Sequence, residues 1–187
     1  MIWDEQTNFL PKMSSKISKE ALDSTDRTIL QLLQQDSTLS NTQLAEHLSL
    51  SVTPCWRRLK RLEDDGFITG YQANLNRRKL GLDVLAFVQL RFMVVSDVSV
   101  KQFESIILVH PSVLSCHKIT GEADYMLQVV AQDLDAYSDF VETVLRQVPG
   151  ISMIHSSLAM REIKSMHRYP VAQEQGSNQP PAPVFIA

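Results

Sequence analysis

The densest group of residues that could do chemistry lies between Ser51 and Leu62, in the run Ser-Val-Thr-Pro-Cys-Trp-Arg-Arg-Leu-Lys-Arg-Leu. This run holds four cations and no acid, and arginine and lysine are the side chains that bind phosphates and guanine edges in duplex DNA. Ser51 or Thr53 can cap a helix here, and Pro54 suits its first position because proline has no N–H to leave unpaired. The run predicts a basic, nucleic-acid-binding helix, against the plainer interpretation of a solvated cationic face.

A helical wheel divides this predicted helix into two sides. At 3.6 residues per turn, one side is an apolar stripe of Val52, Cys55, Leu59 and Leu62. Because Cys55 lies in this stripe, we expect it to be a small buried residue rather than a redox switch. Trp56 falls on a flank. The residues that we expect to contact DNA are Ser51, Thr53, Pro54, Arg57, Arg58, Lys60 and Arg61.

Two shorter helical patterns precede the basic helix and could position it. The first starts at Asp23 or Ser24 as its cap, with Asp26 in the first turn, where the helix dipole favours an anion. Ser40 caps the second, and residues 49–51 form a turn of the length that joins the helices of a helix-turn-helix. Three helices that end in a basic one predict a winged-helix-like DNA-binding domain over residues 20–66.

The formal net charge of the chain is −3, which by itself does not favour a nucleic-acid partner. Residues 22–79 hold eight cations and seven acids, whereas residues 80–171 hold seven cations and ten acids. The basic charge is therefore local, at residues 57–61 and 77–79. So small a cationic surface favours paired subunits on DNA, because affinity rises with the number of phosphates neutralised.

Composition disfavours several other classes of protein. No apolar run approaches the ~18–20 residues that cross a bilayer, and the N-terminus lacks the basic and apolar regions of a secretory signal. Cys55 and Cys116 make no disulfide framework, and the five histidines show no metal-ligand spacing. We expect a cytoplasmic protein without a metal, a cofactor or a membrane partner.

Residues 80–171 alternate strand and helix patterns. Residues 84–94 have the period-two alternation of a strand with one buried face. The whole order is βαββαβ, with strands at 84–94, 113–120, 125–131 and 151–162 and helices before His110 and after Asp133. This order predicts a ferredoxin-like α+β domain, in which one sheet face has no helix to cover it. A second copy of the chain is the natural cover.

The remaining segments are predicted to connect or to flank these domains. Residues 67–79 have a turn signal at Gly70 and are interpreted as a small hairpin or a linker. Residues 1–19 and 172–187 lack core periodicity and are predicted to be disordered tails. Met13 begins a shorter and more ordinary start, so residues 1–12 can be an appendage.

Four motifs in order make the chain similar to the Lrp/AsnC (leucine-/asparagine-responsive) family of prokaryotic transcription factors. The similarity covers about residues 20–171. The run from Thr53 to Gly66 also resembles a cysteine-responsive branch, which makes cysteine one candidate effector. The motifs are Leu22-Asp23-x-x-Asp26-x-x-Ile29-Leu30, Ser51-x-Thr53-Pro54-Cys55-Trp56-x-Arg58-x-x-Arg61-Leu62-Glu63-x-x-Gly66-x-Ile68, Thr120-Gly121-Glu122-x-Asp124-Tyr125 and Val148-Pro149-Gly150-Ile151.

The resemblance implies a sequence-specific regulator of double-stranded DNA whose assembly or DNA affinity responds to a small amino acid. It implies homodimers that assemble to octamers or similar rings, with the effector bound where dimers meet. Asp124 or Glu122 could hold the ammonium of the amino acid. The alternative is that residues 121–124 form only a tight turn. By motif position the candidate effector-binding residues are Gly121, Glu122, Asp124, Tyr125, Ser156 and Ser157.

Two alternative functions remain open on the same two-domain plan. One is a tetrapyrrole decarboxylase-like enzyme, which the retained cations of the basic helix and the scarcity of inward histidines and arginines disfavour. The other is an architectural protein that wraps DNA with little response to an effector. We predict a regulator rather than an enzyme.

Overall fold

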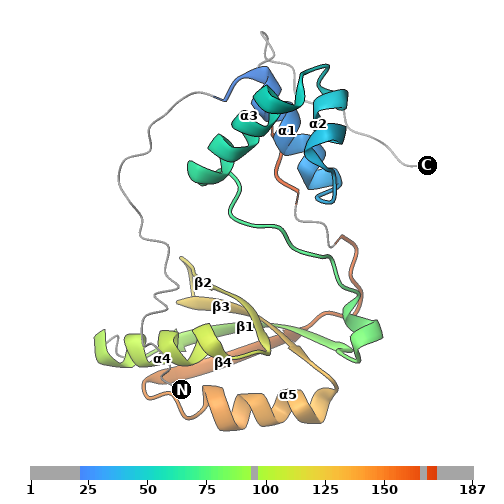
Figure 1. Cartoon of the computed structure of the whole chain (residues 1–187). Coiled ribbons are helices and arrows are strands. Elements are labelled where there is room, and N and C mark those ends of the chain that lie inside the picture. Colours follow the sequence, from blue (N-terminus) through green and yellow to red (C-terminus); the bar gives the residue numbers. More distant parts are fainter. Residues whose placement is uncertain (1–21, 94–96, 165–167, 172–187) are drawn as a thin grey trace, which may run out of the picture. The chain divides into compact units, whose positions relative to one another are not determined.

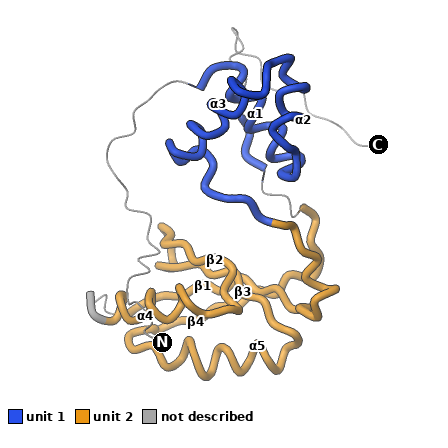
Figure 2. Tube along the Cα trace, in the orientation of Figure 1, with its two compact units in different colours: residues 1–72, 167–187 blue, residues 73–166 orange. Residues whose placement is uncertain are grey.

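The computed structural model describes residues 22–93, 97–164 and 168–171 (Figure 1). The chain divides into one unit of residues 1–72 with 167–187 and a second unit of residues 73–166 (Figure 2). We call them the DNA-binding unit and the effector unit, after the predictions above. The tails predicted to be disordered, 1–19 and 172–187, lie outside the described residues.

The DNA-binding unit has three helices, α1 (Ser24–Gln35), α2 (Asn41–His47) and α3 (Val52–Asp64). Asp23 is the N-cap of α1: its carboxylate accepts from the Asp26 N–H at 2.8 Å, and the Asp26 carboxylate accepts from the Asp23 N–H at 3.2 Å. Such a reciprocal capping box satisfies N–H groups that the first turn leaves unpaired. Ser40 and Gln43 cap α2 in the same way.

The core of this unit joins the three helices through fully buried apolar side chains. The stripe predicted for the basic helix is confirmed at Cys55 and Leu62, both with no exposed surface, whereas Val52 remains exposed. Burial raises the pKa of the Cys55 thiol, which fits a packing role. The other buried apolar residues are Ile29, Leu44 and Ala45.

The segment after α3 contains no strand. Residues 67–76 have no regular structure, and a 3-10 turn, η1 (Arg77–Leu80), follows before Gly81 at φ 75°. The hairpin interpretation is therefore wrong for this chain, and the linker interpretation describes the segment. The Tyr71 hydroxyl donates to the Glu63 carboxylate at 2.9 Å, which fastens the linker to the end of α3.

The effector unit has a four-stranded antiparallel sheet in the order β2-β3-β1-β4. Its strands are β1 (Val84–Phe92), β2 (Val113–Lys118), β3 (Tyr125–Ala131) and β4 (Ile151–Leu158). Helix α4 (Asp97–Val109) follows β1, and α5 (Leu134–Phe140), extended by a π-helical turn over Val141–Leu145, follows β3. The predicted βαββαβ ferredoxin-like fold is confirmed.

Both helices pack on the same face of the sheet. The even residues of β1 lie in one core with Phe103 of α4 and with Tyr137 and Phe140 of α5. The odd residues of β1 must point to the other face, since side chains alternate along a strand. On that face Phe87 remains 39% exposed and Arg91 is also exposed. The prediction of one face without helices is therefore confirmed within the described residues.

The end of the effector domain differs from the predicted boundary at residue 171. The last strand ends at Leu158 instead of residue 162, and residues 168–171 belong to the DNA-binding unit. Sequence periodicity could not place four residues that form no helix or strand.

Candidate nucleic-acid interface and effector site

Helix α3 presents a mixed surface to solvent at its N-terminal half. Ser51, Thr53, Pro54 and Arg57 are all exposed. The Trp56 side chain lies on the same surface and is 49% exposed. Arg57 makes no ion pair with any described residue. A free guanidinium and an exposed indole at the start of a helix are groups that can contact base edges and phosphates in a major groove.

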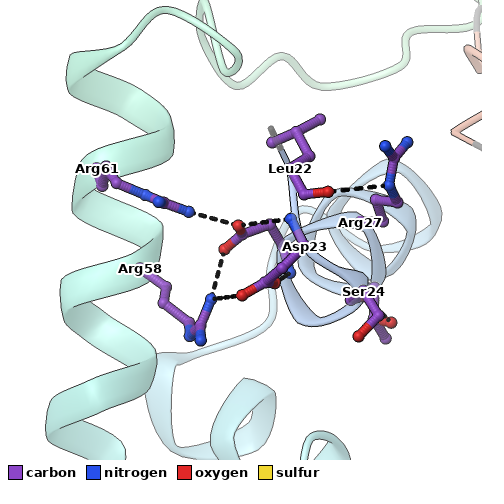
Figure 3. A network of polar contacts seen from close by, with 8 residues as sticks. Leu22, Asp23, Ser24, Arg27, Arg58 and Arg61 are labelled. Carbon is purple, nitrogen blue, oxygen red and sulfur yellow. Dashed lines mark hydrogen bonds and ion pairs between the residues drawn. The ribbon is translucent and has the colours of Figure 1, made fainter. Parts of the chain in front are cut away.

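Two of the residues predicted to contact DNA, Arg58 and Arg61, hold α3 against α1 (Figure 3). The Arg58 guanidinium lies 2.6 Å from the Asp23 carboxylate and 3.0 Å from the Asp26 carboxylate. Arg61 also pairs with Asp26. The Asp26 side chain is 1% exposed, so its charge requires these partners. Arg58 and Arg61 therefore join the two helices, and their contact with DNA stays a prediction.

The electrostatic effects agree with this geometry. The hydrogen bond to Asp23 is the largest cause that raises the pKa of Arg58. The backbone N–H of Asp26, and then Arg58, lower the pKa of Asp23. Each partner thus stabilises the charged form of the other.

Lys60 differs from Arg57, which makes no ion pair with a described residue, and from Arg58 and Arg61, which pair with acids of another helix. It pairs with acids of its own helix and remains exposed. Its ammonium lies 3.0 Å from Asp64 and 3.8 Å from Glu63, one turn further along α3. The Lys60 side chain is 51% exposed, and exposed pairs of this kind contribute little to stability. Its charge is available to a phosphate only in competition with these two acids.

Residues 121–124, the link before β3, form a turn that is held by hydrogen bonds. The Asp124 carboxylate accepts from the Phe92 N–H at 2.7 Å, and the Asp124 N–H donates to the Leu90 carbonyl at 2.8 Å. The Arg91 side chain donates to the Glu122 carbonyl. Gly121 has φ 117°, a backbone conformation that residues other than glycine rarely adopt. This geometry supports the tight-turn alternative for Asp124, whereas the Glu122 side chain is exposed.

Of the other candidate effector residues, Tyr125 and Ser156 lie on the helix-covered face of the sheet and Ser157 lies on the opposite face. Tyr125 is buried, with its hydroxyl 3.4 Å from Glu104 of α4, and burial followed by the charge of Glu104 raises its pKa. Ser156 accepts a 2.5 Å hydrogen bond from the Tyr137 hydroxyl of α5. Ser157 pairs with Phe87 and is exposed on the strand.

The strand pairing separates two of these residues within one chain. Tyr125 flanks β1 on the β3 side and Ser156 flanks it on the β4 side. A shallow hollow at the start of β4 is lined by Arg146 and residues 151–154, and by none of the six candidates.

Two family models match the two units. Residues 22–69 match a winged helix-turn-helix DNA-binding model, and residues 85–169 match the Lrp/AsnC ligand binding domain. The DNA-binding transcriptional activator DecR of Escherichia coli (strain K12) is 42% identical over 150 residues, which cover 80% of this chain and 99% of DecR. The chain belongs to the Lrp/AsnC family.

Further comparisons agree with this membership. The leucine-responsive regulatory protein of Rhizobium meliloti (strain 1021) is 36% identical over 143 residues, which cover 76% of this chain and 92% of that protein. A transcriptional regulator from Neisseria meningitidis, solved in complex with L-Met, is 38% identical with a TM-score of 0.77, covering 81% of this chain and 97% of that one. This Lrp/AsnC protein is thus a DNA-binding transcriptional regulator with an amino-acid-binding domain.

The relatives named here are all transcriptional regulators, so the enzyme alternative gains no support from them. No helix among the described residues of this Lrp/AsnC protein is long and apolar enough to span a membrane.

Sequence reasoning about this Lrp/AsnC protein missed the pairing of α3 with α1. Asp23 and Asp26 are visible as capping residues, but their partners lie 32 to 35 residues further along the chain. The signal available in the sequence was Asp26, an acid three residues before Ile29 and therefore on the apolar side of α1. Trp56 was placed on a flank of the basic helix, and its exposure adds it to the candidate interface.

Proposed function

We propose that this regulator recognises its operator through the exposed N-terminal half of α3. Arg57 makes the base contact, Thr53 and Trp56 contact neighbouring base edges, and Ser51 and Pro54 lie against the adjacent phosphates. Lys60 contributes a phosphate contact of lower weight because Asp64 competes for its ammonium. Arg58 and Arg61 act indirectly, by holding α3 in place.

The observation that carries this proposal is the contrast among the four cations of α3. Three of them have acidic partners within 4 Å, whereas Arg57 has none among the described residues. A guanidinium without a protein partner loses no ion pair when it binds guanine, and a bidentate arginine–guanine contact is worth about 1–3 kcal/mol of discrimination. Arg57 is therefore the cation whose removal should cost the most specificity.

The experiment is a fluorescence anisotropy titration of a duplex that the wild-type protein enriches from a random pool. Arg57→Ala should lower the affinity about 10- to 100-fold, in keeping with the loss of one such contact. Arg146→Ala, which removes an exposed arginine of the effector unit, is the control and should leave the affinity unchanged. Equal affinity of the Arg57→Ala variant and the wild type would contradict the assignment.

We further infer that the effector is a small amino acid bound between subunits. Support comes from the strand pairing, which places Tyr125 and Ser156 on opposite sides of β1, and from the sheet face that no helix of the described residues covers. The Neisseria meningitidis relative was solved with L-Met, and cysteine remains the candidate from sequence, so a sulfur-containing amino acid is the first class to test. Glu122 is the exposed acid of the link and suits the ammonium better than Asp124 does.

We propose that homodimers form through the open sheet face, where exposed Phe87 would be covered, and that dimers associate further. A regulator of chromosomal DNA works where the chromosome is, so we propose a cytoplasmic location. Sedimentation with and without cysteine or methionine tests the assembly. An effector that binds without any change in assembly or DNA affinity would contradict the proposed coupling.

A further inference from the structure

Residues 168–171 lie against α1 of the DNA-binding unit, although the strand that precedes them, β4, belongs to the effector unit (Figures 1 and 2). The Tyr169 N–H donates to the Gln34 side-chain oxygen at 2.6 Å. The Gln34 amide donates back to the Tyr169 carbonyl at 3.1 Å, and the Gln31 amide donates to the Val171 carbonyl at 2.7 Å. Three hydrogen bonds therefore fasten this segment to one helix.

The chemistry of these contacts is that of a helix binding a peptide backbone. Gln34 uses both its donor and its acceptor on the backbone of a single residue, which sets the register of the segment on α1. The Tyr169 side chain is 82% exposed, so burial of its ring does not explain why the segment lies there. The spacing of Gln31 and Gln34, three residues apart, places both amides on one side of α1.

Helix α1 connects these contacts to α3. Its C-terminal half holds residues 168–171 through Gln31 and Gln34, and its N-terminal end holds α3 through Asp23 and Asp26. The match to the ligand binding domain runs to residue 169, so the contact with α1 begins inside that match. The DNA-binding unit is thus joined to the effector unit by chain at two places, after α3 and after β4.

We propose that residues 168–171 are a C-terminal strap, which limits the rotation of the DNA-binding unit and so positions α3 for its operator. A unit attached by one linker can reorient about it, whereas a second attachment on another helix removes much of that freedom. The strap deepens the proposed function, because it gives the effector domain a second connection through which it can act on α3. It does not depend on which α3 residues touch DNA.

The test compares two truncations of the full chain and three point variants. A chain that ends after Val171 keeps the strap, and a chain that ends after Met166 lacks it. Gln34→Ala and Gln31→Ala remove its partners on α1, and Gln35→Ala, an exposed neighbour with no hydrogen bond to the strap, is the matched control. All are made in a Trp3→Phe background, so that Trp56 on α3 is the only tryptophan in the sequence.

The readouts are the anisotropy decay of Trp56 without DNA and the thermal unfolding of α3 followed by its emission. The chain ending after Met166 and the Gln34→Ala variant should show a faster component of rotation. Their Tm should fall by about 4–8 °C, the shift expected when a domain of 60–100 residues loses interactions of this size. The chain ending after Val171 and the Gln35→Ala variant should behave as the wild type.

The proposal is overturned if Trp56 rotates alike in all these proteins, or if the chain ending after Val171 loosens as much as the one ending after Met166. A Tm shift without faster rotation would reduce the strap to a stabilising contact and also refute the positioning role. Should the shorter truncation fail to fold, Gln34→Ala and Gln31→Ala decide the question. Failure of the proposed DNA contacts would appear only in the operator titration, so the two outcomes are distinguishable.

Discussion

Replacement of Arg58 and Arg61 by alanine should destabilise the DNA-binding unit, whereas replacement of Arg57 should not. The Asp26 carboxylate is 1% exposed, and in the double variant its remaining hydrogen bond from a described residue is the one from the Asp23 N–H. Removal of one side of a buried ion pair costs about 3–5 kcal/mol. The two guanidinium groups are 35% and 36% exposed, so solvent already weakens the pairs and we expect about 2–3 kcal/mol.

Urea unfolding followed by Trp56 emission measures this cost in a Trp3→Phe background. With a slope of about 1–2 kcal/mol per molar urea for so small a unit, the midpoint should fall by about 1–3 M in the double variant. Each single variant should lose less, since Asp26 keeps one arginine. Arg57→Ala should stay within about 0.5 kcal/mol of the wild type, as exposed substitutions usually do.

The same proteins separate a positioning role from a contact role on DNA. Arg57→Ala should lose operator affinity at full stability. Asp26→Asn, which leaves Arg57 and the exposed side chains of α3 unchanged, should lose both stability and affinity because α3 is no longer held. The reasoning is refuted if the double arginine variant unfolds at the wild-type midpoint, or if Arg57→Ala unfolds as early as the double variant.

Three further predictions concern single side chains. Lys60→Ala should weaken binding to all sequences alike and reduce the salt dependence by about one unit, with stability changed by less than about 0.5 kcal/mol; titrations at several salt concentrations and urea unfolding would measure both. Asp124→Ala should cost the effector unit about 1 kcal/mol, because the side-chain oxygen that accepts from the Phe92 N–H is lost, and an unchanged melting curve would contradict the hydrogen-bonded turn. The pKa of the Cys116 thiol is raised to about 11 by partial desolvation and then by the charge of Glu104, although the residue is exposed at the surface. Alkylation by iodoacetamide should therefore stay slow near pH 8 and rise with pH through about 11, and a midpoint near 8.5 would refute this environment.

Much of the fold could be predicted because its determinants are local. The period-two run of β1 and the caps at Asp23, Ser40 and Asp133 each depend on residues within a few positions of one another. The linker was harder to predict, since Gly70 signals a turn but cannot show whether the flanking residues pair with another strand. Within the described residues of one chain they find none.

The ion pairs and hydrogen bonds around the candidate site could not be predicted, because their partners are distant in sequence. A helical wheel shows that Arg58 and Arg61 lie beside Arg57, but not that α1 supplies acids for two of the three. The carboxylate of Asp124 likewise has its partner 32 residues away, at Phe92. In both cases a charged residue that looked available for a ligand is already engaged by the protein.

The role of Arg57 in sequence recognition is tested most directly by selecting binding sites from a random duplex pool with the wild type and with Arg57→Ala. The wild type should enrich a motif with a fixed guanine in each half-site, the preferred partner of an arginine in the major groove. The variant should lose the preference at that position and keep the preferences at the others. Enrichment of the same motif, with the guanine intact, by both proteins would contradict recognition through the exposed face of α3 at Arg57.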